Sequence, residues 1–223
     1  CRGNAAAWND GMKIKINLEN DIRLMWPTPV FSRVWPGTKD YNTRLRQIIL
    51  EHEKNNPGVP KSVVGGWHSR EDFMAWPHPE IAQLREWISE ATEELMTVTS
   101  GAAKEDFAAA EISAWANVLR RGAYHRNHTH PGCYWSGVYY VAVGGSGAKW
   151  EHSGAIELSD PRGAVEMVAL PGNPFGQRLT IDPEPGLMLM FPSWVRHAVH
   201  PFMGKGERIT VAFNLAVGEP PSR

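Results

Sequence analysis

Two histidines that stand two residues apart give this sequence its clearest chemical feature. His128 and His130 belong to the His-rich run that covers residues 125–130. Side chains two residues apart on an extended segment point the same way, so these two imidazoles are suited to bind one metal ion. A polar turn that is merely rich in histidine would give the same pattern, and the run alone does not decide between the two.

A third candidate ligand follows the apolar segment expected to form a strand at residues 187–191. The run Phe-Pro-Ser-Trp-Val-Arg-His ends at His197, and His200 comes three residues later. Because residues three apart face opposite sides of a strand, only one of the two is expected to join the pair. Three neutral imidazoles bind zinc as well as iron, so the pattern predicts a metal site without naming its metal.

Polar and apolar residues alternate along the last expected strand, residues 208–217. Its polar face carries Arg208, Thr210, Ala212 and Asn214. Arg208 comes eleven residues after His197, beyond a segment with one proline and two glycines, and we expect a hairpin that returns it to the metal. A guanidinium binds a carboxylate through paired hydrogen bonds. The sequence therefore predicts a cosubstrate that carries a carboxylate, although an exposed sheet edge would alternate in the same way.

The elements that must position these residues change in character near residue 108. Before it, the spacing of apolar residues predicts amphipathic helices at 40–56 and 79–98, and short strands are expected at 13–18 and 29–34. After it, short strands separated by glycine and proline turns are expected at 109–120, 134–143, 155–159, 165–170, 178–182, 187–191 and 208–217.

This order of elements predicts a fold that is mostly β with N-terminal helices. We expect a jelly-roll barrel of two sheets, with the helices packed on one sheet. The 223 residues suit a single domain, residues 1–223. Within it we expect a loose terminus at 1–12, a helical and extended support at 13–108 and the barrel core at 109–217.

Composition excludes several functional classes. The 23 basic and 24 acidic residues give a net charge of −1, which argues against a nucleic-acid binder or a polybasic membrane binder. An apolar run of about 18 residues, as a membrane-spanning helix needs, is absent. Two cysteines, Cys1 and Cys133, do not make a disulfide framework, and we expect a cytoplasmic setting.

Several motifs together resemble the Fe(II)/2-oxoglutarate-dependent dioxygenases of the prolyl-hydroxylase-like type. The resemblance is closest to an uncharacterised subgroup of these oxygenases, and it touches most of the chain from about residue 24 to 216. The motifs that carry it are Gly-Ala-Tyr-His-Arg-Asn-His-Thr-His-Pro (122–131), Ser-Gly-Val-Tyr-Tyr-Val (136–141), Phe-Pro-Ser-Trp-Val-Arg-His (191–197), and Arg208 with Asn214 in the last strand.

The resemblance implies a double-stranded β-helix with Fe(II) at one open end, 2-oxoglutarate as cosubstrate, and O₂. His128 matches the first metal ligand and His197 the distal one. Arg208 matches the residue that pairs with the far carboxylate of 2-oxoglutarate, Tyr140 matches a tyrosine that can hydrogen-bond this carboxylate, and Thr210 fits an Arg-x-Ser/Thr pattern. The implied reaction hydroxylates an unknown small molecule or peptide while 2-oxoglutarate becomes succinate. A homodimer is compatible with the resemblance, because jelly-roll oxygenases often pair.

This chain departs from the wider family at one ligand position. Two residues after the first histidine the family has a carboxylate, whereas this chain has His130. The loss of a negative charge is expected to weaken the retention of Fe(II). Three interpretations are open: His130 is the third ligand, an outside carboxylate such as Glu151 replaces it, or the position is vacant. We favour His130, which makes His128, His130 and His197 the expected catalytic metal site.

Two other functions fit the same residues. One is a three-histidine metalloenzyme of the cupin type that does not use 2-oxoglutarate. The other is a non-catalytic β-barrel that binds a metal or a ligand. Arg208 separates them from the oxygenase, because its guanidinium has a clear task only if a dicarboxylate binds.

Overall fold

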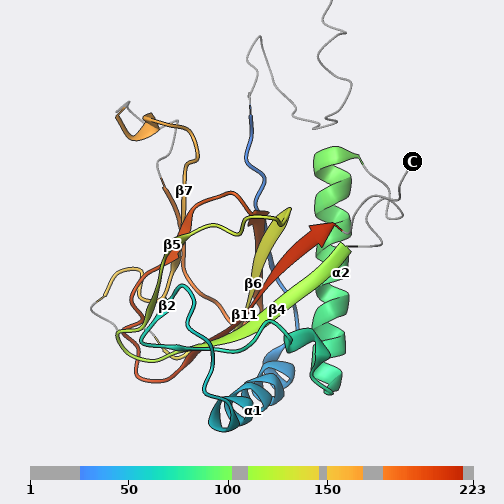
Figure 1. Ribbon diagram of the computed structural model, residues 1–223, viewed down its shortest axis with the longest axis vertical. Helices are drawn as coiled ribbons and strands as arrows, with labels where there is room; N and C mark the ends of the chain where they lie inside the picture. Colours follow the sequence, from blue (N-terminus) through green and yellow to red (C-terminus); the bar gives the residue numbers. More distant parts are fainter. Residues whose placement is uncertain (1–25, 102–109, 146–149, 168–177, 218–223) are drawn as a thin grey trace, which may run out of the picture.

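Two antiparallel sheets face each other in the computed structural model, which describes residues 26–101, 110–145, 150–167 and 178–217 (Figure 1). One sheet has six strands in the order β1 (Phe31–Val34), β9 (Leu187–Pro192), β6 (Trp135–Val143), β11 (Arg208–Val217), β4 (Ala110–Leu119) and β3 (Trp67–His68). The other has five strands in the order β2 (Val63–Val64), β5 (Tyr124–His128), β10 (His197–Val199), β7 (Ile156–Ser159) and β8 (Arg178–Ile181). The mostly β, two-sheet arrangement agrees with the jelly-roll prediction.

The six-stranded sheet separates two apolar cores because successive side chains of a strand point to opposite faces. On β11, Ile209 and Phe213 pack in one core with side chains of helices α1 (Lys39–Asn55) and α2 (Pro79–Ser100). The alternate residues Arg208 and Thr210 line a cavity on the other face. Figure 1 shows α1 and α2 on the outer side of this sheet, with the five-stranded sheet across the barrel.

Local signals in the sequence account for both ends of helix α2. Pro79 occupies the first turn of α2, where its missing N–H has no helical partner to lose. Gly101 ends the same helix in the left-handed region, at φ 67°, which glycine adopts without strain. Among the described residues, no helix is long and apolar enough to cross a membrane.

Buried polar contacts attach the two helices to each other and α1 to the sheet. The hydroxyl of Tyr41 on α1 donates to the carbonyl of Glu80 on α2 at 2.8 Å. The hydroxyl of Tyr139 on β6 donates to Oδ1 of Asn42 on α1, also at 2.8 Å. These hydrogen bonds satisfy groups that would otherwise be buried without partners, and they fix the support on which the central strand β6 rests.

The structure corrects two sequence-based expectations about elements and adds two strands at the site. Residues Val165–Met167 form the 3₁₀ helix η3 instead of the start of a strand, and 168–170 lie outside the described residues. The terminus at 1–12 and the strand expected at 13–18 also lie outside them. The expected hairpin between His197 and Arg208 is wrong, because β10 and β11 belong to different sheets. The two short strands β5 and β10, which carry histidines, were not among the expected strands.

Candidate metal centre

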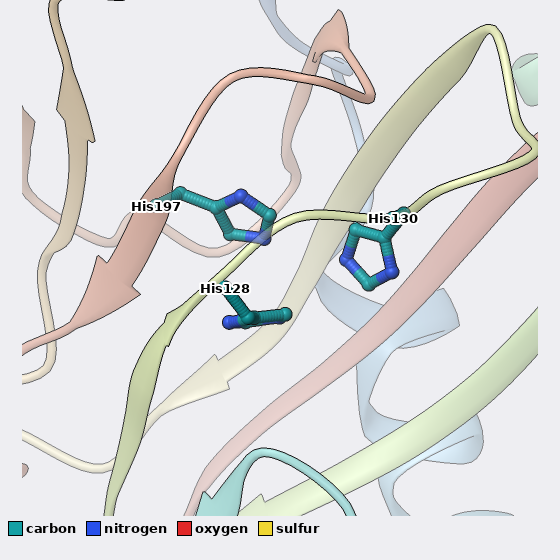
Figure 2. A group of neighbouring side chains, drawn as sticks. All are labelled: His128, His130 and His197. Atoms are coloured by element: carbon teal, nitrogen blue, oxygen red, sulfur yellow. The ribbon is translucent and has the colours of Figure 1, made fainter.

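Backbone pairing brings two of the candidate ligands together. His128 ends β5 and His197 begins β10, and the two residues are direct partners in the antiparallel ladder. Their ring centroids lie 4.2 Å apart. The ring of His130 lies 5.0 Å from that of His128 and 5.2 Å from that of His197. One ligand atom from each histidine falls within 4.8 Å of the others, and Figure 2 shows the three rings converging.

Hydrogen bonds to the main chain set the tautomer of two of these rings. Nδ1 of His128 lies 2.7 Å from the carbonyl oxygen of Arg126, and Nδ1 of His197 lies 3.0 Å from that of Val195. A carbonyl oxygen only accepts hydrogen bonds, so in each ring Nδ1 carries the proton. Nε2 therefore keeps the lone pair that a metal ion would bind.

Burial keeps the three imidazoles neutral. Desolvation, followed by the nearby His128, lowers the pKa of His130 to about 4. The same causes lower the pKa of His197 to about 3, and desolvation lowers the pKa of His128 as well. A metal ion binds the neutral form of imidazole. At neutral pH these rings therefore bind a metal ion without first losing a proton.

Two turns hold the third histidine in place. The backbone N–H of His130 donates to the carbonyl of Ser193 at 3.0 Å, and the N–H of Ser193 donates to the carbonyl of Tyr134 at 3.0 Å. The turn that carries His130 is thus attached to the turn that leads into β10. Together they place His130 beside the paired strands although it lies outside both.

Arg208 lies in the cavity that the three histidines also line. It is 1% exposed, and its Nε donates to the carbonyl of Gly154 at 2.8 Å. Its guanidinium carbon lies 5.0 Å from the ring centroid of Tyr140, a cation–π contact. Among the described residues, the cavity lining includes no aspartate or glutamate. The structure therefore buries a guanidinium without an acidic partner there, and burial lowers the pKa of Arg208.

Two buried polar atoms of the cavity have no hydrogen-bond partner among the described residues. They are the hydroxyl oxygen of Tyr140 and Oδ1 of Asn117 on β4. Leaving such an atom unpaired costs about 1–3 kcal/mol, which is explained if a ligand supplies the missing bond. Thr210 lines the same cavity and is 2% exposed. We expected Tyr140 and Thr210 here from the sequence but missed Asn117. The feature that could have revealed Asn117 is its amide, which stands among the otherwise apolar residues 114–119.

Ser62 is a second residue that the sequence did not reveal. Its Oγ lies 3.2 Å from Nδ1 of His125 and 3.4 Å from Nε2 of His128. His125 is 7% exposed, and desolvation, followed by the charge of Arg208, lowers its pKa well below the usual value. His125 and Ser62 therefore line the same cavity as the three histidines and Arg208.

Other candidates do not reach the site. The side chain of Glu151 is 90% exposed, approaches His152 at 3.7 Å and does not line the cavity, so the interpretation in which Glu151 replaces the usual carboxylate is wrong. His200 contacts Glu157, with 3.2 Å between Nε2 and Oε2, and stands outside the group of three. The choice of His197 over His200 agrees with the structure.

Residues 113–214 match the family model described as "Putative 2OG-Fe(II) oxygenase", where 2OG is 2-oxoglutarate. The matched segment includes all three histidines, Tyr140, Arg208 and Thr210. This match and the two-sheet fold make the chain similar to the 2OG-Fe(II) oxygenases. The resemblance to oxygenases of the prolyl-hydroxylase-like type is thereby confirmed.

Solved structures that are similar to this chain share its fold. A prolyl-4-hydroxylase from Pseudomonas putida has a TM-score of 0.61 at 15% identity over 86% of this chain and 94% of that one. A viral collagen prolyl hydroxylase from Paramecium bursaria Chlorella virus-1, in complex with 2-oxoglutarate, has a TM-score of 0.57 at 12% identity over 84% and 96%. HygX from Streptomyces hygroscopicus, with nickel and 2-oxoglutarate bound, has a TM-score of 0.55 at 12% identity over 86% of this chain and 84% of that one. No curated protein matches the sequence.

The described residues fit the metal and the cosubstrate of this family. Three neutral imidazoles with converging nitrogens are a suitable donor set for Fe(II). The buried guanidinium and the unpaired hydroxyl of Tyr140 suit a carboxylate in the same cavity. Neither fit identifies a substrate.

Proposed function

We propose that this oxygenase holds Fe(II) with His128, His130 and His197 and binds 2-oxoglutarate with Arg208, Tyr140 and Thr210. We further propose that it hydroxylates its substrate. The observation that carries the proposal is the buried guanidinium of Arg208, which lines one cavity with the three imidazoles and has no carboxylate beside it in the described lining. Such a cation is stabilised when a dicarboxylate completes its hydrogen bonds.

The protein's residues divide the work between metal binding and cosubstrate binding. Fe(II), 2-oxoglutarate and O₂, when bound together, supply an oxidation in which 2-oxoglutarate loses CO₂ to become succinate and a substrate C–H bond is hydroxylated. The histidines donate nitrogen lone pairs. Arg208 and the hydroxyl of Tyr140 fix the far carboxylate of 2-oxoglutarate, which orients its other end toward the histidines.

The apolar wall of the cavity has a separate task. Phe191 is 2% exposed and its ring centroid lies 4.8 Å from that of His197. Ile156 and Val199 line the cavity from the five-stranded sheet. These side chains keep water away from the reacting groups and so strengthen the ion pair between Arg208 and the cosubstrate.

Hydroxylation is the reaction type that the similar structures support best, because two of them are prolyl hydroxylases. The substrate class stays open between a peptide and a small molecule. We also propose that the protein acts in the cytoplasm and pairs as a homodimer.

An anaerobic titration tests the proposed function. The metal-free protein is titrated with Fe(II) and then with 2-oxoglutarate, and the visible charge-transfer band of the chelated 2-oxo acid is recorded. His130→Ala and His197→Ala are titrated in parallel. His78→Ala is the matched control, because His78 is exposed at the start of α2 and lies far from the ligand set in the chain.

The outcomes separate the three candidate functions. A band in the wild type and in His78→Ala, absent from the other two variants, supports the oxygenase with three histidine ligands. Fe(II) binding without a band favours the cupin-type metalloenzyme, for which the three-histidine donor set is typical. Failure to bind Fe(II) leaves a non-catalytic barrel.

A further inference from the structure

His130 differs from the other two histidines in the partner of its second nitrogen. In His128 and His197, Nδ1 faces a main-chain carbonyl. In His130, Nδ1 lies 3.3 Å from Nδ2 of the Asn214 side-chain amide. A carbonyl can only accept, whereas an amide offers one acceptor oxygen and one donor nitrogen. The tautomer of His130 therefore depends on which end of the amide faces it.

Asn214 is held by a buried neighbour in a fixed register. Its Oδ1 accepts from Oγ of Ser136 at 2.8 Å. Asn214 on β11 and Ser136 on β6 are direct ladder partners, and the two are 8% and 2% exposed. The chain His130–Asn214–Ser136 thus connects the turn that carries the third histidine to the centre of the six-stranded sheet.

The two orientations of the amide have opposite consequences for a metal ion. When Nδ2 donates to Nδ1 of His130, the proton of the neutral ring is on Nε2, which then has no lone pair for a metal. When the amide turns by half a rotation, Oδ1 accepts from Nδ1–H and Nε2 is free. Ser136 permits both, because a hydroxyl donates to Oδ1 in the first orientation and accepts from Nδ2 in the second.

We propose that Asn214, supported by Ser136, is a positioning residue that selects the Nδ1–H tautomer of His130 and so makes its Nε2 a metal ligand. This inference rests on the proposed role of His130 as third ligand. Partners of this kind orient a ligating imidazole and raise its basicity, and their loss typically costs about 10- to 100-fold in metal affinity. Metal binding is thereby coupled to a half-turn of the Asn214 amide.

Three variants test the proposal. Asn214→Asp replaces the amide by an acceptor-only carboxylate, so it selects Nδ1–H at all times and is expected to bind Zn(II) at least as tightly as the wild type. Asn214→Leu keeps the volume but removes both polar atoms, and is expected to bind Zn(II) about 10- to 100-fold more weakly. Ser136→Ala leaves the amide without its support and is expected to fall between them.

The control is Asn42→Leu, in which an equally buried asparagine is lost from the helix side of the sheet, where it accepts from Tyr139. It is expected to unfold more easily than the wild type and to bind Zn(II) normally. Zn(II) affinity is measured by competition with a chelator. The ¹⁵N shifts of the His130 ring report which nitrogen is protonated, without and with Zn(II), and thermal unfolding confirms that each variant is folded.

The results distinguish failure of this inference from failure of the proposed function. We expect His130 to carry its proton on Nδ1 in the Zn(II)-bound wild type. In Asn214→Asp we expect the same tautomer without and with Zn(II). In Asn214→Leu we expect weaker Zn(II) binding. Unchanged affinity and an unchanged tautomer in folded Asn214→Leu and Ser136→Ala overturn the role of Asn214 alone. A wild type that binds no Zn(II), or a His130→Ala variant that binds it normally, overturns the ligand assignment and this inference with it.

Discussion

His197 lies directly opposite His128 on the antiparallel pair of β10 and β5, with 4.2 Å between their ring centroids. Cross-strand partners in an antiparallel ladder bring their side chains close together on one face of the sheet. A slip of one residue in this pairing would turn one imidazole to the other face. The register of two short strands therefore determines the distance between two of the three candidate ligands, whereas the third depends on a turn.

Removing a cross-strand histidine should weaken metal binding more than removing any supporting residue. In His197→Ala the two remaining ligands keep their main-chain contacts but the site loses one nitrogen. We expect Zn(II) affinity to fall by more than the loss of about 10- to 100-fold that removal of an outer partner causes. Chelator competition measures the loss, and affinity equal to that of the His78→Ala control would contradict the assignment of His197.

Arg208→Gln should separate cosubstrate binding from metal binding. Glutamine keeps a donor for the carbonyl of Gly154 but removes the charge. A hydrogen bond to a charged partner contributes about 1.5–3 kcal/mol, so 2-oxoglutarate affinity should fall about 10- to 150-fold while Zn(II) affinity stays the same. Isothermal titration calorimetry of the Zn(II)-loaded protein measures 2-oxoglutarate binding, and chelator competition measures Zn(II) affinity. Arg46→Gln, which breaks a surface ion pair with Glu207, is the control; 2-oxoglutarate binding in Arg208→Gln as tight as in this control would overturn the role of Arg208.

Tyr140→Phe should have opposite effects on stability and on cosubstrate binding. The hydroxyl is buried without a partner, so its removal should leave the free energy of unfolding of the ligand-free protein unchanged or raise it by about 1 kcal/mol. If this hydroxyl donates to the carboxylate of 2-oxoglutarate, the same change should weaken the binding of 2-oxoglutarate about 10- to 150-fold. Urea unfolding and calorimetry give the two values. A loss of stability without a loss of affinity would show that the hydroxyl has a structural role.

The candidate ligands were predictable from the sequence because their spacing is local. The two-residue step from His128 to His130 and the apolar strand before His197 mark them without any knowledge of topology. The alternation along β11 also predicted which face would be polar, and Arg208 and Thr210 line the cavity as expected. Such patterns succeed because the side-chain period of a strand is two.

What escaped the sequence depends on contacts between distant residues. Ser62 reaches the histidines through the pairing of β2 with β5, a contact between residues more than sixty positions apart. Asn117 lies on a strand that is otherwise apolar, and only the cavity shows that its Oδ1 lacks a partner. The placement of β10 and β11 in opposite sheets likewise follows from long-range pairing, which a local pattern of turn residues does not specify.

Gly137 should be intolerant of any side chain. It is the ladder partner of Phe213, and a Cβ added to it would come within 2.2 Å of that ring and 2.9 Å of the carbonyl oxygen of Leu189. Gly137→Ala should lower the free energy of unfolding by about 1–3 kcal/mol, and Phe213→Leu in the same chain should recover part of the loss. Urea unfolding measures both. Gly163→Ala is the control because its Cβ would meet open space, and equal stability of the two alanine variants would contradict the packing argument.

The buried histidines should make the metal-free protein sensitive to acid. The folded-state pKa is about 3 for His197 and about 4 for His130, whereas an unfolded histidine has a pKa of about 6.5. Between these values the unfolded state binds more protons, so the free energy of unfolding is constant above about pH 6.5 and falls as the pH decreases toward 3. For His197, which is 5% exposed, the slope is at most about 1.4 kcal/mol per pH unit. Urea unfolding between pH 7.5 and 4.5 should show this decline in stability, and His197→Gln should show a shallower decline. Equal stability of the wild type across that range would mean that burial does not keep its histidines neutral.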